Sequence, residues 1–220
     1  MKKKDIVRIA KNSGVNLIYF MYCDNANLIR GKATHIDHLD RRIDSGIGLT
    51  VGQQAAYDMD LVADIEGMGT AGEARILPDI DSMDGFFPLP WSPKRAMLIG
   101  DLVKLDMTPW ACPRIFLKTQ ISKASNLGLE IMTGLEPEWY VAKYDPESDY
   151  YKPIENSQSF HSTGFTPYID FIDDLIDTLA ILDMKVETYY PESGPGHIEV
   201  TLRPEDALKA ADNHIFYREA

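Results

Sequence analysis

The sequence has few cysteines and no long apolar run. Only Cys23 and Cys112 occur among 220 residues, and they show neither metal-ligand spacing nor a disulfide framework. No apolar stretch approaches the roughly 18 residues of a membrane span, and no signal-peptide hydrophobic region follows the first lysines. These absences predict a globular protein of the reducing cytoplasm, with no membrane partner.

Positive charge is also scarce. The chain has 34 acidic against 22 basic residues and a formal net charge of -12. This balance argues against nucleic acid or an anionic membrane surface as the main partner, and it fits a protein that binds cations. With 45% hydrophobic residues, the chain is expected to fold into one large domain or one and a half ordinary ones.

Two pairs of glutamates carry the chemistry. The first pair, Glu136 and Glu138, lies in Gly134-Leu-Glu-Pro-Glu138. Side chains at i and i+2 of an extended strand share one face, so these two carboxylates are expected to point the same way and to repel each other. A shared divalent cation relieves that repulsion, and carboxylate oxygens are natural ligands of Mg²⁺ or Mn²⁺.

The second pair is Glu192 and Glu199. Residues 197–202 alternate polar and apolar, which predicts a half-buried strand that carries Glu199 on its polar face. The Gly194-Pro-Gly196 turn before it returns Glu192 toward the same strand. One such pair alone is more typical of a solvated strand edge. Two acidic strands joined in this way favour a metal site.

The expected elements of the first part form a small α+β unit with a mixed sheet. Helices are predicted at residues 3–13 and 37–44, and strands at 15–22, 28–36, 47–51, around Leu61, 73–77 and 96–102. The segment 78–93 is predicted to be a loop that exposes Phe86, Phe87 and Trp91. The boundary to a second part is expected at residues 109–113.

The second part is expected to alternate helices and strands. A helix that begins at Pro113 ends before Gly128, a strand region covers 129–142, and a strand covers 185–190. The helix after Pro167 has an apolar stripe of Ile169, Ile172, Leu175, Ile176, Leu179 and Leu182, with its aspartates in water. The last helix, from Pro204, has no C-terminal cap, so we expect the natural structure to continue.

The chain resembles glutamine synthetases over its whole length. Similar motifs follow in the family's order: Arg30-Gly-Lys32, Gly72–Asp79, Leu89-Pro-Trp91, Gly100-Asp101, Pro113-Arg114 and Gly134–Glu138. The resemblance implies an α+β fold in which residues 1–108 hold an N-terminal β-grasp domain. Residues 109–220 are then the first part of a catalytic α/β domain with a curved antiparallel sheet, which is expected to be truncated.

The resemblance also implies roles for individual residues. Glu138, Glu192 and Glu199 match the carboxylates of one metal site, Glu136 matches a ligand of a second, and Glu187 matches a nucleotide-contacting glutamate. The complete family enzyme uses two or three Mg²⁺ or Mn²⁺ ions and takes ATP as co-substrate. No catalytic residue is assigned within these 220 residues.

By resemblance, the parent activity is an ATP-dependent ligation in nitrogen metabolism, as in glutamine biosynthesis. ATP phosphorylates the side-chain carboxylate of glutamate, and ammonia or an amine displaces phosphate from γ-glutamyl phosphate. Two departures favour an organic amine. The region Thr50–Ala56 lacks the aspartate that helps ammonia-using members bind ammonium. The link from Glu192 to Glu199 resembles the γ-glutamylamide and γ-glutamylpolyamine ligase branch, and His197 stands where a glutamine is usual.

The resemblance also sets expectations for assembly and activity. Family members form rings of identical subunits. They continue for about as many residues again, with a further metal ligand and the arginines that stabilise phosphoryl transfer, so this chain alone is predicted to be inactive. One alternative is a catalytically inactive metal-binding, regulatory or assembly protein derived from this fold. A glycosidase with paired carboxylates is a second alternative, which Mn²⁺ binding would distinguish.

Overall fold

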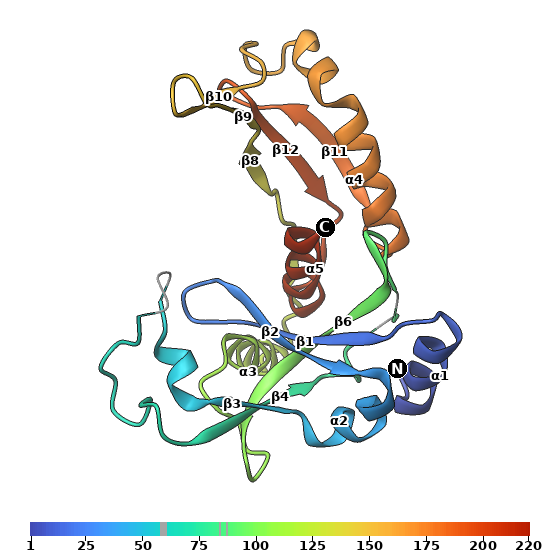
Figure 1. The fold of residues 1–220 in the computed structure, drawn as a ribbon, viewed down its shortest axis with the longest axis vertical. Coiled ribbons are helices and arrows are strands. Elements are labelled where there is room, and N and C mark those ends of the chain that lie inside the picture. The colour runs from blue at the N-terminus through green and yellow to red at the C-terminus, as the bar shows by residue number, and fades with distance from the viewer. Residues whose placement is uncertain (58–60, 84, 87) are drawn as a thin grey trace. The chain divides into compact units, whose positions relative to one another are not determined.

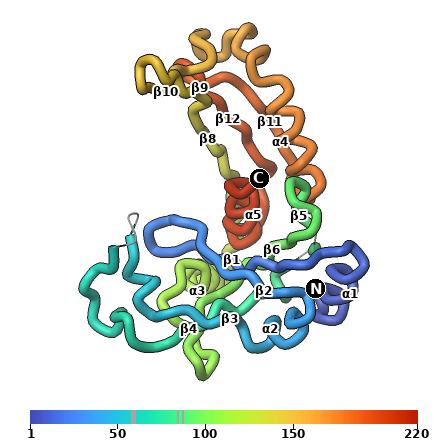
Figure 2. The backbone as a smooth tube through the Cα atoms, viewed as in Figure 1, coloured from blue at the N-terminus to red at the C-terminus, as the bar shows by residue number. Residues whose placement is uncertain are grey.

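The computed structural model describes residues 1–57, 61–83, 85–86 and 88–220. The chain divides into two compact units, Met1–Ile131 and Met132–Ala220, and each is described here by itself (Figures 1 and 2). Both units combine helices with strands, which confirms the predicted α+β class. Among the described residues, no helix is both long and apolar enough to cross a membrane.

The first unit is built on a mixed sheet with the order β2-β1-β6-β4-β3, and β5 also pairs with β6. The long strand β6 is parallel to β1 and antiparallel to β4, so it joins the two halves of the sheet. The strands are β1 (Leu17–Cys23), β2 (Ile29–His35), β3 (Ile47–Thr50), β4 (Glu73–Pro78), β5 (Pro88–Leu89) and β6 (Ser92–Lys104).

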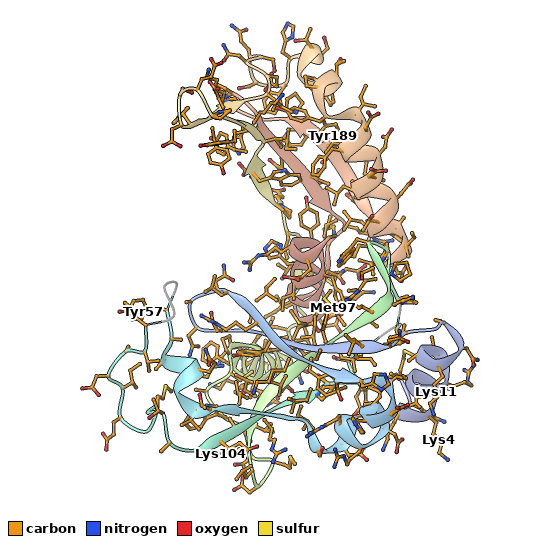
Figure 3. The ribbon with its side chains drawn as sticks, in the orientation of Figure 1. Lys4, Lys11, Tyr57, Met97, Lys104 and Tyr189 are labelled. Atoms are coloured by element: carbon orange, nitrogen blue, oxygen red, sulfur yellow. The ribbon has the colours of Figure 1, made fainter. Side chains whose placement is uncertain are left out.

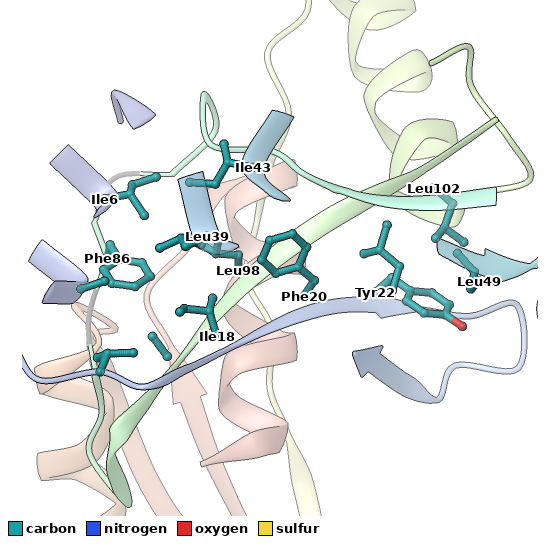
Figure 4. Close-up of a cluster of buried hydrophobic side chains, with 14 of the residues drawn as sticks. Ile6, Ile18, Phe20, Tyr22, Leu39, Ile43, Leu49, Phe86, Leu98 and Leu102 are labelled. Carbon is teal, nitrogen blue, oxygen red and sulfur yellow. The ribbon is translucent and has the colours of Figure 1, made fainter. Parts of the chain in front are cut away.

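Helices α1 and α2 contribute to the core of this sheet. Phe20 of β1 and Leu98 of β6 are fully buried in one cluster with Leu39 of α2, as Figure 4 shows. The positive φ of Gly46, +64°, ends α2 where the sequence predicted a stop. The helical elements are α1 (Lys3–Asn12), η1 (Ile36–His38), α2 (Leu39–Ser45), η2 (Val51–Ala55) and α3 (Pro113–Asn126).

Two predictions for the first unit are wrong. Phe86 is not exposed: it is 4% exposed and belongs to the buried hydrophobic core of the first unit (Figure 4). Leu61 lies in no strand among the described residues and is 51% exposed, and only an isolated bridge joins Ala56 to Val62 beside it. Trp91 is 41% exposed, as predicted, whereas Phe87 lies outside the described residues.

A compact ion cluster attaches α3 to the sheet of the first unit. The Arg114 guanidinium donates to Asp79 Oδ2 at 2.8 Å and to Asp101 Oδ1 at 2.7 Å. Lys118, one turn further along α3, pairs with both aspartates. Arg114 also donates to the Ser82 hydroxyl at 2.7 Å. Every carboxylate of this cluster therefore has cationic partners.

The second unit packs α4 and α5 against a three-stranded antiparallel sheet of order β11-β12-β8. Ile172, Leu175 and Leu179 are buried as predicted, but Ile169 is 51% exposed because it stands at the first position of α4, outside the packed stripe. The elements are β7 (Met132–Thr133), β8 (Glu138–Tyr140), β9 (Ala142–Asp145), β10 (Tyr150–Pro153), η3 (Ser162–Tyr168), α4 (Ile169–Ile181), β11 (Val186–Pro191), β12 (His197–Leu202), β13 (Glu205–Asp206) and α5 (Ala207–Glu219).

Candidate metal centre

The predicted glutamates lie on or next to three neighbouring strands of the second unit. Strand β12 pairs with β8 on one side and β11 on the other, and the three lie side by side in Figure 1. The register places Glu138 opposite Glu199, and Glu199 opposite Tyr190. Ile198 and Val200 are fully buried in the core that β12 shares with α4. The alternation of β12 therefore turns Glu199 to the opposite face.

Glu199 is the buried member of the set. It is only 4% exposed, and its Oε1 atom has no hydrogen-bond partner among the described residues. Hydrogen bonding to the Glu199 carboxylate, together with burial and nearby negative charge, raises the pKa of Tyr190 to about 12. A buried carboxylate with an unused acceptor has a high desolvation cost, which a bound cation would offset.

Glu138 lies beside a histidine of the neighbouring strand. His197 Nε2 is 3.0 Å from Glu138 Oε2, and the imidazole stacks on the ring of Tyr140 with centroids 4.3 Å apart. Glu138 is about half exposed at its side chain, 48%, against 13% for His197. The His197 contact therefore orients the Glu138 carboxylate at the exposed edge of the same polar face.

Glu136 directly precedes Pro137 and β8, and Glu192 directly follows β11. Glu136 precedes β8, but Val200 N donates to Pro137 O at 3.2 Å, so the ladder continues past the end of the strand. The charges of Glu136, Glu192 and Glu199 all contribute to the raised pKa of Tyr190. The negative charges of these three carboxylates therefore all act on one phenol.

Glu187 occupies a different place. It stands at a β-bulge, where the pairing of β11 with β12 shifts between Val186 and Thr188, and its side chain is exposed. It is not among the carboxylates that act on Tyr190. In this respect Glu187 differs from Glu136, Glu192 and Glu199, whose charges act on Tyr190.

Tyr190 is a site residue that the sequence pattern did not reveal. It lies two residues before Glu192, and aromatic residues in strands are most often packing residues. Its position opposite Glu199 depends on the pairing of β11 with β12 and on the bulge at Glu187. The bulge shifts the register by one residue, and a pattern of period two does not show such a shift.

Glu138 and Glu199 lie on one face of the sheet, but the glutamates do not form a preformed metal-coordination site. In the parts of the chain that the structure describes, no three His, Cys, Asp or Glu side chains are close enough to hold a metal ion together. Carboxylates without a cation repel one another, which favours such an open arrangement. The unpartnered Oε1 of Glu199 and the hard oxygen donors around it nevertheless fit a divalent cation.

Two family models together span the chain. Residues 1–110 match the glutamine synthetase N-terminal domain, and residues 110–220 match the glutamine synthetase catalytic domain. The chain belongs to the glutamine synthetase family. The resemblance inferred from the ordered motifs is thereby confirmed at the level of the family.

Curated relatives agree with this assignment. A glutamine synthetase of Mycobacterium tuberculosis is 26% identical over 224 residues, which cover 99% of this chain and 48% of the relative. A gamma-glutamylanilide synthase of Acinetobacter is 23% identical over 240 residues, 94% of this chain and 47% of the relative. The chain thus spans about half the length of the curated relatives it matches.

Solved structures agree on the fold. The crystal structure of a novel glutamine synthase homologue shares 28% identity with a TM-score of 0.79, over 93% of this chain and 47% of that one. A GmaS/ADP complex has a TM-score of 0.80 at 20% identity, over 97% of this chain and 47% of that one. This chain therefore has the fold of the corresponding half of those proteins.

Proposed function

We propose that the chain is the first half of an ATP-dependent glutamate–ammonia or glutamate–amine ligase. The observation that carries the proposal is the buried Glu199 carboxylate, whose Oε1 has no partner among the described residues, within a sheet face that also holds Glu138. A structural strand would bury a neutral residue at that position, because an uncompensated buried carboxylate destabilises the fold. Membership of the glutamine synthetase family supplies the reaction class.

In this proposal, Glu138, Glu192 and Glu199 hold one Mg²⁺ or Mn²⁺ ion, and Glu136 is a ligand of a second. When bound, the ions would offset the negative charge that builds up as phosphate oxygens of ATP approach glutamate. The chain's own residues orient the ligands: Tyr190 holds Glu199 through its hydroxyl, and His197 holds Glu138. Glu187 is assigned to nucleotide contact.

The nitrogen donor is proposed to be an organic amine. Thr50–Ala56 supplies no carboxylate for ammonium, and Gln54 in this segment is 2% exposed and accepts a hydrogen bond from Asn25 through its side-chain oxygen. The segment is therefore occupied by a neutral internal contact. A relative named gamma-glutamylanilide synthase is consistent with this choice.

The remaining assignments follow from the family. We propose a cytoplasmic protein that works in a ring of identical subunits, with a β-grasp domain in residues 1–108 and the start of the catalytic domain in 109–220. The parallel β1–β6 pair beside the β1–β2 hairpin supports the β-grasp assignment. We propose that these 220 residues alone do not catalyse ligation.

Mn²⁺ binding tests the metal centre directly. Electron paramagnetic resonance of unbound Mn²⁺ is expected to show saturable binding to the chain, and Glu199→Gln is expected to weaken it about 100-fold, since a buried charged ligand is lost. Asp173→Asn, an exposed acid on α4, is the matched control and should leave the affinity unchanged. Equal binding by the chain and its Glu199→Gln variant would contradict the proposal.

The reaction class needs a separate test. In a protein that joins this chain to the second half of a family member, release of phosphate from ATP should require glutamate together with a nitrogen donor. Methylamine, aniline and putrescine are compared with ammonium, and an organic amine is expected to have the higher kcat/KM. Phosphate release without any nitrogen donor would indicate a different activity, and a preference for ammonium would reject the amine assignment alone.

A further inference from the structure

A segment that none of the family motifs includes packs against the connection between β11 and β12. The segment runs through residues 155–165, and the connection through 191–197, which includes Glu192. Phe160 N donates to Pro191 O at 3.1 Å, and Ser159 Oγ donates to Ser193 Oγ at 3.0 Å. We call residues 155–165 the clamp segment, because it holds the connection on both sides of Glu192.

The strongest contacts of the clamp segment come from one carboxylate. Glu155 Oε1 accepts the backbone N–H of Gly196 at 2.9 Å, while its other oxygen accepts the N–H of Ser157. Burial alone would raise the pKa of Glu155, but the hydrogen bonds from Ser157 and Gly196 outweigh it and hold the pKa below its ordinary value. Each oxygen of this partly buried carboxylate therefore has its own N–H donor.

The Gly196 end of this contact has little freedom. Gly196 has a φ of +72°, and a Cβ atom there would lie 2.5 Å from Val141 O. The backbone next to it closes the connection, since Glu192 N donates to His197 O at 2.8 Å. A shift of Gly196 would therefore change the path of the chain between Glu192 and Glu199.

Aromatic pairs extend the clamp to β11. The ring of Phe160 lies 5.5 Å from that of Tyr190, and the ring of Phe165 lies 5.4 Å from that of Tyr189 in an edge-on arrangement. Tyr189 is itself a residue of β11 and is labelled in Figure 3. Tyr190 also lies directly opposite Glu199 in the pairing of β11 with β12. The clamp segment thus contacts the supports of both Glu192 and Glu199.

We propose that Glu155 is a positioning residue of the metal centre: by holding the Gly196 N–H, it sets the separation between Glu192 and Glu199. The inference rests on the proposed function, because the two glutamates matter as a pair only if they share a cation. Outer groups that orient metal ligands commonly change metal affinity by 10–100-fold when they are removed. Glu155 would act in this way through the backbone.

The test compares Mn²⁺ affinity in the chain and three variants. Glu155→Gln places an NH₂ group against one of two N–H donors, and we expect Mn²⁺ affinity to fall about 10-fold. Glu155→Asp keeps both acceptor oxygens and should recover most of the affinity. Glu147→Gln, an exposed glutamate of the same unit, should match the unchanged chain. Hydrogen exchange at the Gly196 amide should accelerate in Glu155→Gln alone.

The outcomes separate the two proposals. If the unchanged chain binds no Mn²⁺, the metal centre is rejected and the role of Glu155 with it. If the unchanged chain binds Mn²⁺ and Glu155→Gln binds it equally well, only the role of Glu155 is rejected. If Glu155→Gln fails to fold by circular dichroism, Gly196→Ala replaces it, because its Cβ atom would displace the N–H that Glu155 holds. Unchanged Mn²⁺ affinity in folded Gly196→Ala would then reject the positioning role.

Discussion

The two units differ in whether their buried carboxylates are paired with cationic side chains. In the first unit, Asp79 and Asp101 share Arg114 and Lys118 as partners. Burial alone would raise the pKa of Asp79, but the hydrogen bonds and charges of Lys118 and Arg114 prevail and hold that pKa well below its ordinary value. The negative charge is neutralised within the protein.

In the second unit, carboxylates accumulate without this compensation. Glu199 is more deeply buried than either aspartate, yet its neighbours across the sheet are Glu138 and Tyr190, and its Oε1 has no partner among the described residues. The family motifs include members of both groups: Asp79, Asp101 and Arg114 in the first unit and Glu138 in the second. An acidic cluster whose carboxylates pair with cationic side chains of the chain stabilises the fold. An acidic cluster without such partners is suited to binding a cation from solution.

The largest expected effect is the loss of the internal cation in the first unit. Arg114→Ala leaves Asp79 and Asp101 partly buried with only Lys118, and should lower the free energy of unfolding by about 3 kcal/mol. Urea unfolding followed by hydrogen exchange assigns the loss to the first unit. Arg8→Ala, in an exposed pair with Asp5, should cost less than about 0.5 kcal/mol. If Arg114→Ala and Arg8→Ala lowered the free energy of unfolding equally, the ion cluster of the first unit would contribute no more than an exposed ion pair.

Neutralising a carboxylate in the second unit should raise the free energy of unfolding, whereas the same change in the first unit should lower it. Without metal, Glu199→Gln removes a poorly compensated buried charge and should raise the free energy of unfolding by about 1 kcal/mol. Asp101→Asn, the matched change in the first unit, should lower it, because Arg114 and Lys118 lose a partner. Urea titration in a metal chelator measures both variants. A destabilised Glu199→Gln protein would show that Glu199 is already well compensated.

The smallest expected effect is a change in the pKa of Tyr190. The pKa of Tyr190 is raised to about 12, so its stabilising contribution is complete below pH 10, the ordinary value, and is lost as the pH rises toward 12. The difference in absorbance at 295 nm between the chain and Tyr190→Phe should report this pKa. In Glu199→Gln it should move toward 10, since the hydrogen bond to a carboxylate is lost. If the pKa of Tyr190 were unchanged in Glu199→Gln, the Glu199 carboxylate would not be the cause of its rise.

Much of the fold was accessible from the sequence. Helix α3 begins at Pro113 and ends at Asn126, before Gly128, because proline fits the first helical turn and glycine favours the end. The apolar face of β12 and the turn at Gly194-Pro-Gly196 were likewise predicted from residues 197–202 and their flanks. These features depend on neighbours a few residues away.

Other predictions failed because they depend on distant contacts. Phe86 stands in a loop of proline and glycine, and only its packing against the first unit's core buries it. Ile169 continues the apolar period of α4 but lies beyond the packed surface. Local periodicity specifies which residues share a helix or strand face, and it does not specify how far the opposing surface extends.

By itself, the sequence determined the family and the α+β class, and it predicted the paired glutamates as a site, because these follow from motif order and short-range spacing. Only the tertiary structure decided that Glu199 lies between Glu138 and Tyr190, that Glu187 stands apart at a bulge, and that Glu155 reaches Gly196. Strand register and side-chain burial join residues that are far apart in the chain. Their energies depend on packing, which a local pattern does not contain.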